Sequence, residues 1–206
     1  MHAQKTDKPG DNKPLIALLV DSDPKRTRIV ESGLVGAEIT TMDSSNIGDL
    51  MTVIEDLQPD VVIMDCERPD SDTIENLQKV AKENPRPVVM FVQDVDGSLA
   101  RKAVRAGVSG YIVDGLSAAR VKPVIDIAIE RFAVVDQLRR ERDKSREDLE
   151  TRKLLDRAKG FLMDQRGMSE SEAYSAMRNL AMTEAIPMRR VAERIISVSK
   201  ILVPNI

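Results

Sequence analysis

Short apolar runs alternate with amphipathic stretches over the first 120 residues of the chain. The runs are continuous rather than interrupted by polar residues, which is typical of strands buried on both faces of a parallel sheet. Helix signals separate them: Asp23-Pro24 fits an N-cap with a proline at the first helical position, and a helix from Ile47 to Leu57 should end at Pro59. The predicted strands are 15–20, 37–42, 61–65, 88–92 and 109–113.

The strict alternation of strands and helices predicts an α/β fold, a doubly wound parallel sheet covered by helices on both faces. Five strand–helix units fit the flavodoxin-like strand order 2-1-3-4-5, in which a site forms at the carboxyl ends of the strands. The residues expected at those ends are Asp21, Asp23, Asp65, Val92 and Asp114.

A long helical pattern follows from Val121 without a convincing break, although Pro123 should keep the hydrogen-bond ladder irregular in its first turn. The apolar positions disappear over 139–148 and resume at Leu149. The segment is either a solvated spacer between two domains or a coiled-coil stalk through which two chains dimerise, and we expect the stalk. Its expected seam is Ile125, Ala128, Phe132 and Val135.

The remaining residues form three amphipathic stripes, which predict three short helices around one small core. The first helix should end near Met163, Ser169-x-x-Glu172 is a capping box for the second, and Pro187 should be the first residue of the third. The second stripe is Ala173, Met177, Leu180 and Ala181, and the third is Met188, Val191, Ile195, Val198 and Leu202.

The expected organisation therefore has four parts. Residues 1–14 are a polar leader that we expect to be disordered, 15–120 form the α/β domain, 121–147 form the helical or coiled-coil linker, and 148–206 form the three-helix domain.

The amino-acid composition excludes several kinds of chemical site. The single cysteine, Cys66, excludes an internal disulfide and any multi-cysteine metal site, and the single histidine, His2, lies in the leader. No nucleophile–base pair is recognisable, so we expect no enzyme activity, no cofactor and no metal. No apolar run approaches membrane-spanning length, so we expect a cytoplasmic protein without membrane contact.

Charge is divided unevenly along the chain. Residues 139–206 hold 15 Lys and Arg against 11 Asp and Glu, whereas the preceding residues hold 16 against 23. The basic part suggests a polyanionic partner. Gly160 lies inside a predicted helix, where glycine costs about 1 kcal/mol relative to alanine. It either allows another helix to approach or leaves room for the backbone of a ligand, and the sequence does not separate these alternatives.

Residues 15–135 resemble a bacterial response-regulator receiver domain. In that family an acidic pair after the first strand and an aspartate ending the third hold Mg²⁺, and the latter aspartate accepts a phosphoryl group. Asp65 matches the acceptor and Asp21 the first acid, while Ser22 replaces the second acid, with Asp23 beside it. The family has a Thr or Ser at the end of the fourth strand and a Lys at the end of the fifth, and this chain has Val92 and Asp114 there.

These departures remove a hydroxyl and add an anion, whereas phosphoryl transfer needs donors and cations around the developing charge. We therefore expect a pseudo-receiver in which Asp21, Asp23 and Asp65 form a degenerate phosphoacceptor pocket, and we expect Cys66 to serve packing rather than redox sensing. The alternative is a phosphorylation-dependent response-regulator receiver whose helical part serves dimerisation or protein docking.

Three short patterns in the helical part resemble the ANTAR domain, a three-helix RNA-binding module of bacterial transcription antiterminators. They are A-K-G-x-L-M at 158–163, A-Y-x-x-x-R at 173–178 and P-M-R-R-V-A at 187–192, and the resemblance covers residues 148–203. It implies that the chain binds paired stem-loops in mRNA leaders and prevents termination. The implied RNA-binding residues are Lys159, Gly160, Tyr174 and Arg178, with Arg157, Arg166, Arg189 and Arg190 added on charge and position.

The whole plan, with YIVDGL at 111–116 and RVKPVIDIAIERF at 120–132, most resembles the nitrate/nitrite-assimilation antiterminators of the NasT type, and the amidase regulators share a similar plan. That similarity implies control by a separate nitrate/nitrite sensor protein, NasS-like, rather than by phosphorylation. It also implies a leader with tandem hairpins. Two joined copies would gain effective concentration on two hairpins, which is a reason to expect a homodimer through the linker helix.

Overall fold

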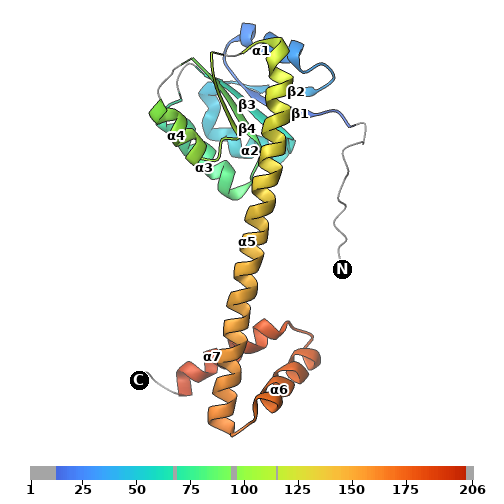
Figure 1. Cartoon of the computed structure of the whole chain (residues 1–206), viewed down its shortest axis with the longest axis vertical. Coiled ribbons are helices and arrows are strands. Elements are labelled where there is room, and N and C mark those ends of the chain that lie inside the picture. The colour runs from blue at the N-terminus through green and yellow to red at the C-terminus, as the bar shows by residue number, and fades with distance from the viewer. Residues whose placement is uncertain (1–12, 67–68, 94–96, 115, 203–206) are drawn as a thin grey trace. The chain divides into compact units, whose positions relative to one another are not determined.

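The computed structural model describes residues 13–66, 69–93, 97–114 and 116–202, with side chains as far as Val198. Most of the leader expected at 1–14 and the side chain of Leu202 lie outside the described residues. The chain divides into two compact units, Met1–Asp136 and Gln137–Ile206, called unit 1 and unit 2 below (Figure 1).

Unit 1 contains a five-stranded parallel sheet in the order β2-β1-β3-β4-β5, which confirms the flavodoxin-like prediction. Its strands are β1 (Ile16–Val20), β2 (Glu38–Met42), β3 (Val61–Cys66), β4 (Val88–Val92) and β5 (Gly110–Val113). Val20 pairs with Met64, and Cys66 pairs with Val92. This register brings the carboxyl ends of β1, β3 and β4 together at one edge of the sheet.

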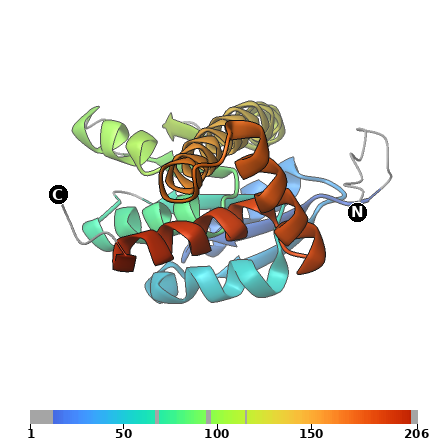
Figure 2. The ribbon, with the colours of Figure 1, turned by 90° about the horizontal axis from the view of Figure 1, so that it is seen from below.

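Two apolar cores lie on opposite faces of the sheet because successive side chains of a strand point to opposite sides. Leu18 and Met90 belong to the core shared with α2 (Leu50–Leu57), α3 (Ser71–Glu83) and α4 (Gly97–Arg105). Leu19 and Phe91 belong to the core shared with α1 (Pro24–Gly33) and α5 (Ala118–Arg166). Figure 2 shows α2 and the first part of α5 on different sides of the strands.

The helix signals of unit 1 are mostly confirmed. Asp23 caps α1 by accepting a hydrogen bond from the backbone N–H of Lys25, and Pro24 is the first helical residue. The second helix differs from the prediction, since a 3₁₀ helix η1 (Ser44–Asp49) precedes α2 and contains Ile47. Ile47 still packs against the same core as Leu50 and Ile54, so the apolar spacing is kept although the backbone around Ile47 is 3₁₀ rather than α-helical.

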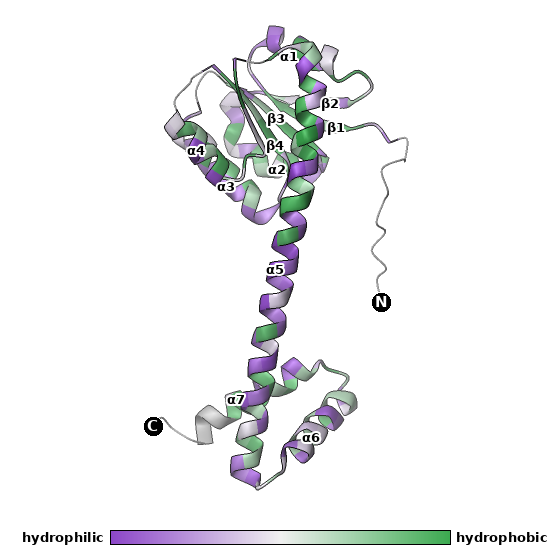
Figure 3. Cartoon of the chain, in the orientation of Figure 1, coloured by the Kyte–Doolittle hydropathy of each residue, from purple (hydrophilic) through white to green (hydrophobic). Residues whose placement is uncertain are grey.

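Helix α5 is continuous over 49 residues, as the unbroken pattern predicted, but it begins earlier than expected. It starts at Ala118, where the carbonyl of Ser117 accepts from Val121 N–H, so Pro123 lies inside the helix rather than in its first turn. Figure 3 shows mainly hydrophilic residues along the middle of α5.

The coiled-coil seam expected on α5 is wrong in its first half. Ile125 and Ala128 are buried in unit 1 against α1 and the sheet, so they cannot face a second chain. Val135 and Leu149 are exposed. The 3-4 spacing that suggested a seam is equally the spacing of a helix face packed on its own sheet.

Unit 2 packs the end of α5 against α6 (Glu170–Thr183) and α7 (Met188–Leu202). Its core cluster consists of Ala158, Met177, Ala181, Val191 and Ala192, and Ala173 of α6 is buried as well. The capping box is confirmed: Ser169 and Glu172 exchange both hydrogen bonds. Two stripe positions were wrong, since Leu180 is 40% exposed and Val198 is 49% exposed. Pro187 precedes α7 instead of starting it, and its carbonyl accepts from Arg190 N–H.

Within the described residues, none of the helices combines the length and apolar character that crossing a membrane requires.

Candidate nucleic-acid interface and acidic pocket

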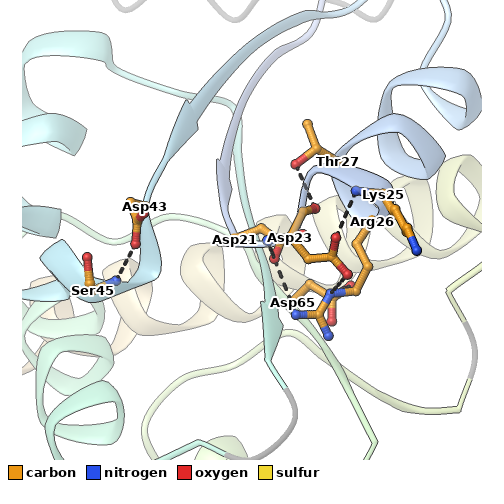
Figure 4. A network of polar contacts seen from close by, with 8 residues as sticks. All are labelled: Asp21, Asp23, Lys25, Arg26, Thr27, Asp43, Ser45 and Asp65. Carbon is orange, nitrogen blue, oxygen red and sulfur yellow. Dashed lines mark hydrogen bonds and ion pairs between the residues drawn. The ribbon is translucent and has the colours of Figure 1, made fainter.

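Three carboxylates meet at the carboxyl edge of the sheet in unit 1 (Figure 4). Asp21 directly follows β1, Asp23 caps α1, and Asp65 lies near the end of β3. Asp21 Oδ1 accepts from the backbone N–H of Asp23 at 2.8 Å, which fixes the first two residues relative to each other. The structure thus brings together the three aspartates expected at the ends of the strands.

A fourth residue of this pocket, Arg26, was missed from the sequence. Its guanidinium lies 3.5 Å from Asp21 Oδ1, 3.7 Å from Asp23 Oδ2 and 3.6 Å from Asp65 Oδ2. The i,i+3 spacing from Asp23 could have indicated one of these ion pairs. The pairing with Asp65 depends on the register of β1 and β3, so it requires the fold.

Burial controls the electrostatics of this pocket. Asp21 is 3% exposed and Asp65 is 5% exposed, and one oxygen of each, Oδ2, has no hydrogen-bond partner. Burial raises the pKa of Asp65 to about 6; the Arg26 guanidinium opposes this effect, and the charges of Asp21 and Asp23 add to it. Asp65 is therefore a buried acid that titrates just below neutral pH.

The pocket does not fit the Mg²⁺ ion that the receiver resemblance implies. Magnesium takes octahedral oxygen ligands at about 2.0–2.1 Å, mainly carboxylates and water. Here Ser22 is exposed, Asp23 Oδ1 is engaged in capping α1, and the guanidinium of Arg26 contacts the carboxylates that would bind the ion. Among the described residues, no group of three or more acidic, histidine or cysteine side chains is arranged to hold a metal.

The neighbouring strand ends carry no phosphate-binding side chain of the expected kind. Val92 is buried at the end of β4, while Asp114 is exposed and has a positive φ of 47°. The N–H of Asp114 donates to the Val92 carbonyl, which continues the sheet by one residue.

Cys66 is half-buried and packs against the core of unit 1. Burial raises the pKa of its thiol to about 11, with the charge of Asp65 adding to the effect. The thiolate is the reactive form of cysteine, so this thiol is poorly suited to redox sensing, in agreement with the packing role expected for it.

In unit 2, several of the cations predicted to bind RNA already have carboxylate partners. Lys159 Nζ lies 2.7 Å from Glu170 Oε1 and 3.0 Å from Asp156 Oδ1, and its side chain is only 17% exposed. The pair with Glu170 ties the end of α5 to the start of α6. These partners raise the pKa of Lys159, with the Glu170 hydrogen bond as the largest cause.

The two α7 arginines predicted to bind RNA, Arg189 and Arg190, are also paired. Arg189 contacts Glu193 at 3.1 Å and Glu147 of α5 at 3.0 Å. Arg190 contacts the other oxygen of Glu193 at 3.0 Å. Much of the positive charge of unit 2 is therefore neutralised within the unit, which the net charge of the sequence alone does not reveal.

The other predicted cations, Arg157, Arg166 and Arg178, are exposed, and the described part of the chain gives them no ion pair. Tyr174 is 48% exposed and lies one turn before Arg178 on α6. Met182, one further turn along α6, is 69% exposed and was not among the residues expected from the sequence. Tyr174, Arg178 and Met182 form what we call the α6 face.

Gly160 faces open space. A Cβ atom added at this position would meet no atom within 4 Å outside the helix's own neighbouring backbone. Within the described chain no second helix approaches this glycine, so the first of the two explanations suggested by the sequence does not apply inside the chain.

Known protein families match both units. The response regulator receiver domain matches residues 17–126, and the ANTAR domain matches residues 143–196. The transcriptional regulatory protein PdtaR of Mycobacterium tuberculosis (strain H37Rv) is 36% identical over 136 residues, which is 66% of this chain and 66% of that protein. This chain thus spans about two thirds of the length of its curated relative.

Solved structures agree on the fold of unit 1. The signal receiver domain of a modulated diguanylate cyclase from Desulfovibrio desulfuricans G20 is 18% identical, with a TM-score of 0.51 over 59% of this chain and 98% of that one. A CheY-like receiver domain protein from Methanospirillum hungatei JF-1 is 19% identical, with a TM-score of 0.51 and the same coverage. The chain belongs to the response regulator receiver family and combines its receiver domain with an ANTAR domain.

Proposed function

We propose that this chain is a transcription antiterminator that binds paired stem-loops in mRNA leaders through unit 2 and so prevents a terminator hairpin from forming. The observation that carries the proposal is the ANTAR match over 143–196 on a helical unit whose α6 face and Gly160 are open to solvent. PdtaR, the relative named above, is itself described as a transcriptional regulatory protein.

The chemistry of the exposed groups suits folded RNA. Sequence-specific RNA recognition targets unpaired loop bases, which stack on aromatic rings, while Lys and Arg bind phosphates. Tyr174 offers a half-exposed ring one turn from the guanidinium of Arg178. Gly160 lets an RNA backbone approach α5 closely, because it has no side chain to hold the RNA away.

The cations divide into two groups in this proposal. Arg157, Arg166 and Arg178 bind phosphate directly, because no carboxylate of the described residues has to be released from them first. For Lys159, Arg189 and Arg190, phosphate has to replace a carboxylate, so their contribution to the binding free energy is smaller than that of an unpaired cation.

We further propose that the target is a leader of nitrate/nitrite assimilation genes, as in NasT-type antiterminators. Control then comes from a NasS-like nitrate/nitrite sensor protein rather than from phosphorylation. Val92, Asp114 and Arg26 support control without phosphorylation, because none of them reproduces the groups that a phosphorylated receiver uses.

A homodimer on tandem hairpins completes the proposal, but through a different face of α5 than the seam predicted from the sequence. Ile127, Val134 and Leu138 are 62%, 58% and 60% exposed and are spaced by seven and four residues, so they share one side of the helix. This spacing is typical of a coiled-coil stripe, and we propose it as the dimer contact.

Binding of full-length protein to a leader RNA with two hairpins tests the proposed function. We expect retention that falls steeply with salt, because phosphate contacts release counterions, and we expect weaker binding to an RNA cut down to one hairpin. A duplex RNA without loops is the matched control. Equal binding to all three RNAs, or no salt-sensitive binding, would show that the chain is not an antiterminator of this kind.

The second candidate is a phosphorylation-dependent receiver whose helical part serves docking or dimerisation, and the gathering of Asp21, Asp23 and Asp65 favours it. Incubation with a small phosphodonor and Mg²⁺ separates the two. A stable acylphosphate on Asp65, lost in Asp65→Asn, would support this candidate, and an unmodified chain would eliminate it.

A further inference from the structure

The positive charge in the acidic pocket of unit 1 comes from the chain itself. One guanidinium, that of Arg26, lies within 4 Å of carboxylates from three places in the sequence: the end of β1, the cap of α1 and the end of β3. Figure 4 shows the four side chains converging from these elements.

Burial makes this arrangement energetically important. The side chains of Asp21 and Asp65 are 0% and 4% exposed, and that of Arg26 is 20% exposed. Buried charges are costly unless they are paired, and neighbouring carboxylates repel each other. By comparison, the two side chains of the Lys122–Asp126 pair are 65% and 53% exposed, so that pair is an ordinary surface ion pair of little energetic weight.

The position of Arg26 is fixed by its surroundings. The Asp23 cap and Pro24 set the first turn of α1, and Arg26 is the third residue of that helix. Its side chain extends towards the end of β3, where Asp65 Oδ2 accepts no hydrogen bond and has the guanidinium as its nearest positive partner, at 3.6 Å.

We infer that Arg26 is the resident cation of this pocket and takes the place of a divalent metal, so that unit 1 holds its carboxylates together without Mg²⁺. A bound divalent ion would lie beside a guanidinium that already contacts the same oxygens, and the two positive charges would repel. The inference concerns unit 1 only and does not depend on RNA binding.

Thermal unfolding of the full chain tests this inference directly. Wild type, Arg26→Met and the control Arg28→Met are compared in a chelator and in millimolar MgCl₂ or MnCl₂. Arg28 lies on the same helix, is exposed and has no ion pair among the described residues. Methionine keeps the length of the arginine stem but removes its charge.

We expect wild type and Arg28→Met to unfold at the same temperature with and without the metal. Arg26→Met should unfold several degrees lower in chelator and should regain most of that loss with metal, because a ligand that binds only the folded state stabilises it. A metal-dependent shift in wild type as large as in Arg26→Met would overturn the inference, as would an Arg26→Met variant that unfolds like wild type in chelator.

A double variant keeps the test decisive if Arg26→Met does not fold in chelator. Arg26→Met with Asp65→Asn lacks both the cation and one of the buried charges that it offsets. We expect this double variant to fold and to show no response to metal. A double variant as unstable as Arg26→Met alone would mean that Arg26 acts through packing, and the inference would fail.

Discussion

Asp65 is the residue whose environment departs most from that of an ordinary surface carboxylate. Its pKa of about 6 lies above the usual value of 3.8, mainly because the carboxyl is buried. Between these two values the folded state binds more protons than the unfolded state. Stability therefore falls as the pH rises through this window, and the full cost of the buried charge is present above about pH 6.

Replacing Asp65 by Asn should remove this cost. A shift of about two pKa units corresponds to roughly 3 kcal/mol, so Asp65→Asn should be more stable than wild type at pH 7 by up to that amount. The variant should also lose the fall in stability between pH 4 and pH 6. Urea unfolding at a series of pH values measures both effects, and parallel curves for the two proteins would contradict the assignment.

At Gly160, one substitution should change the stability of the fold and the proposed RNA binding in opposite directions. An added Cβ meets no neighbour, so Gly160→Ala should stabilise the helix by about 1 kcal/mol through its helix propensity. If RNA approaches the backbone there, the same change should weaken RNA binding several-fold. Urea unfolding of Gly160→Ala measures the change in stability, and RNA titration of the same variant measures the change in affinity. Tighter or unchanged RNA binding would show that Gly160 is not part of the proposed interface.

At the scale of elements, the α/β alternation was predictable because buried parallel strands appear as continuous apolar runs, and all five strands were found within one residue of the prediction at each end. The helix starts that were predicted wrongly depend on the structure around them. Ile47 fits either a 3₁₀ helix or an α-helix, and Pro123 lies inside α5 although prolines are usually confined to first turns.

The features of the candidate sites likewise fall into those that the sequence could predict and those that depend on the fold. Gathering of the aspartates followed from strand order alone, because the carboxyl ends of parallel strands share one edge. The contacts of Arg26 with Asp65, of Lys159 with Glu170 and of Arg189 with Glu147 join residues that meet only in the folded chain, so the sequence could not assign them. The partners three or four residues away on the same helix could have been predicted from their spacing.

The link between α5 and α6 gives a prediction at this scale. Glu170 neutralises Lys159 and would repel RNA phosphate, so Glu170→Gln should bind the two-hairpin RNA a few-fold more tightly than wild type. Glu150→Gln is the matched control, because Glu150 pairs with Arg146 on the exposed middle of α5. Weaker binding by Glu170→Gln alone would show that Glu170 positions Lys159 rather than competing with RNA.

At the scale of the whole molecule, the proposed dimer lets two copies of the chain bind two hairpins of one RNA. Leu138→Glu places a charge in the exposed α5 stripe, whereas Ala133→Glu places it at an exposed position on another side of the helix. We expect Leu138→Glu to be monomeric by sedimentation and to lose the preference for two hairpins over one, while Ala133→Glu stays dimeric. If both variants remain dimeric, the dimer contact lies outside the exposed α5 stripe.

The account as a whole depends on unit 2 presenting the α6 face and its unpaired cations to RNA. Affinity of Arg178→Ala for the two-hairpin RNA, measured over a salt series with circular dichroism of the same samples, tests this most directly. Arg178 is exposed and unpaired within the described chain, so helicity should be unchanged. Binding should weaken by about tenfold, roughly 1.4 kcal/mol, and the salt slope should fall by about one. Wild-type affinity and slope in this variant would contradict the central claim.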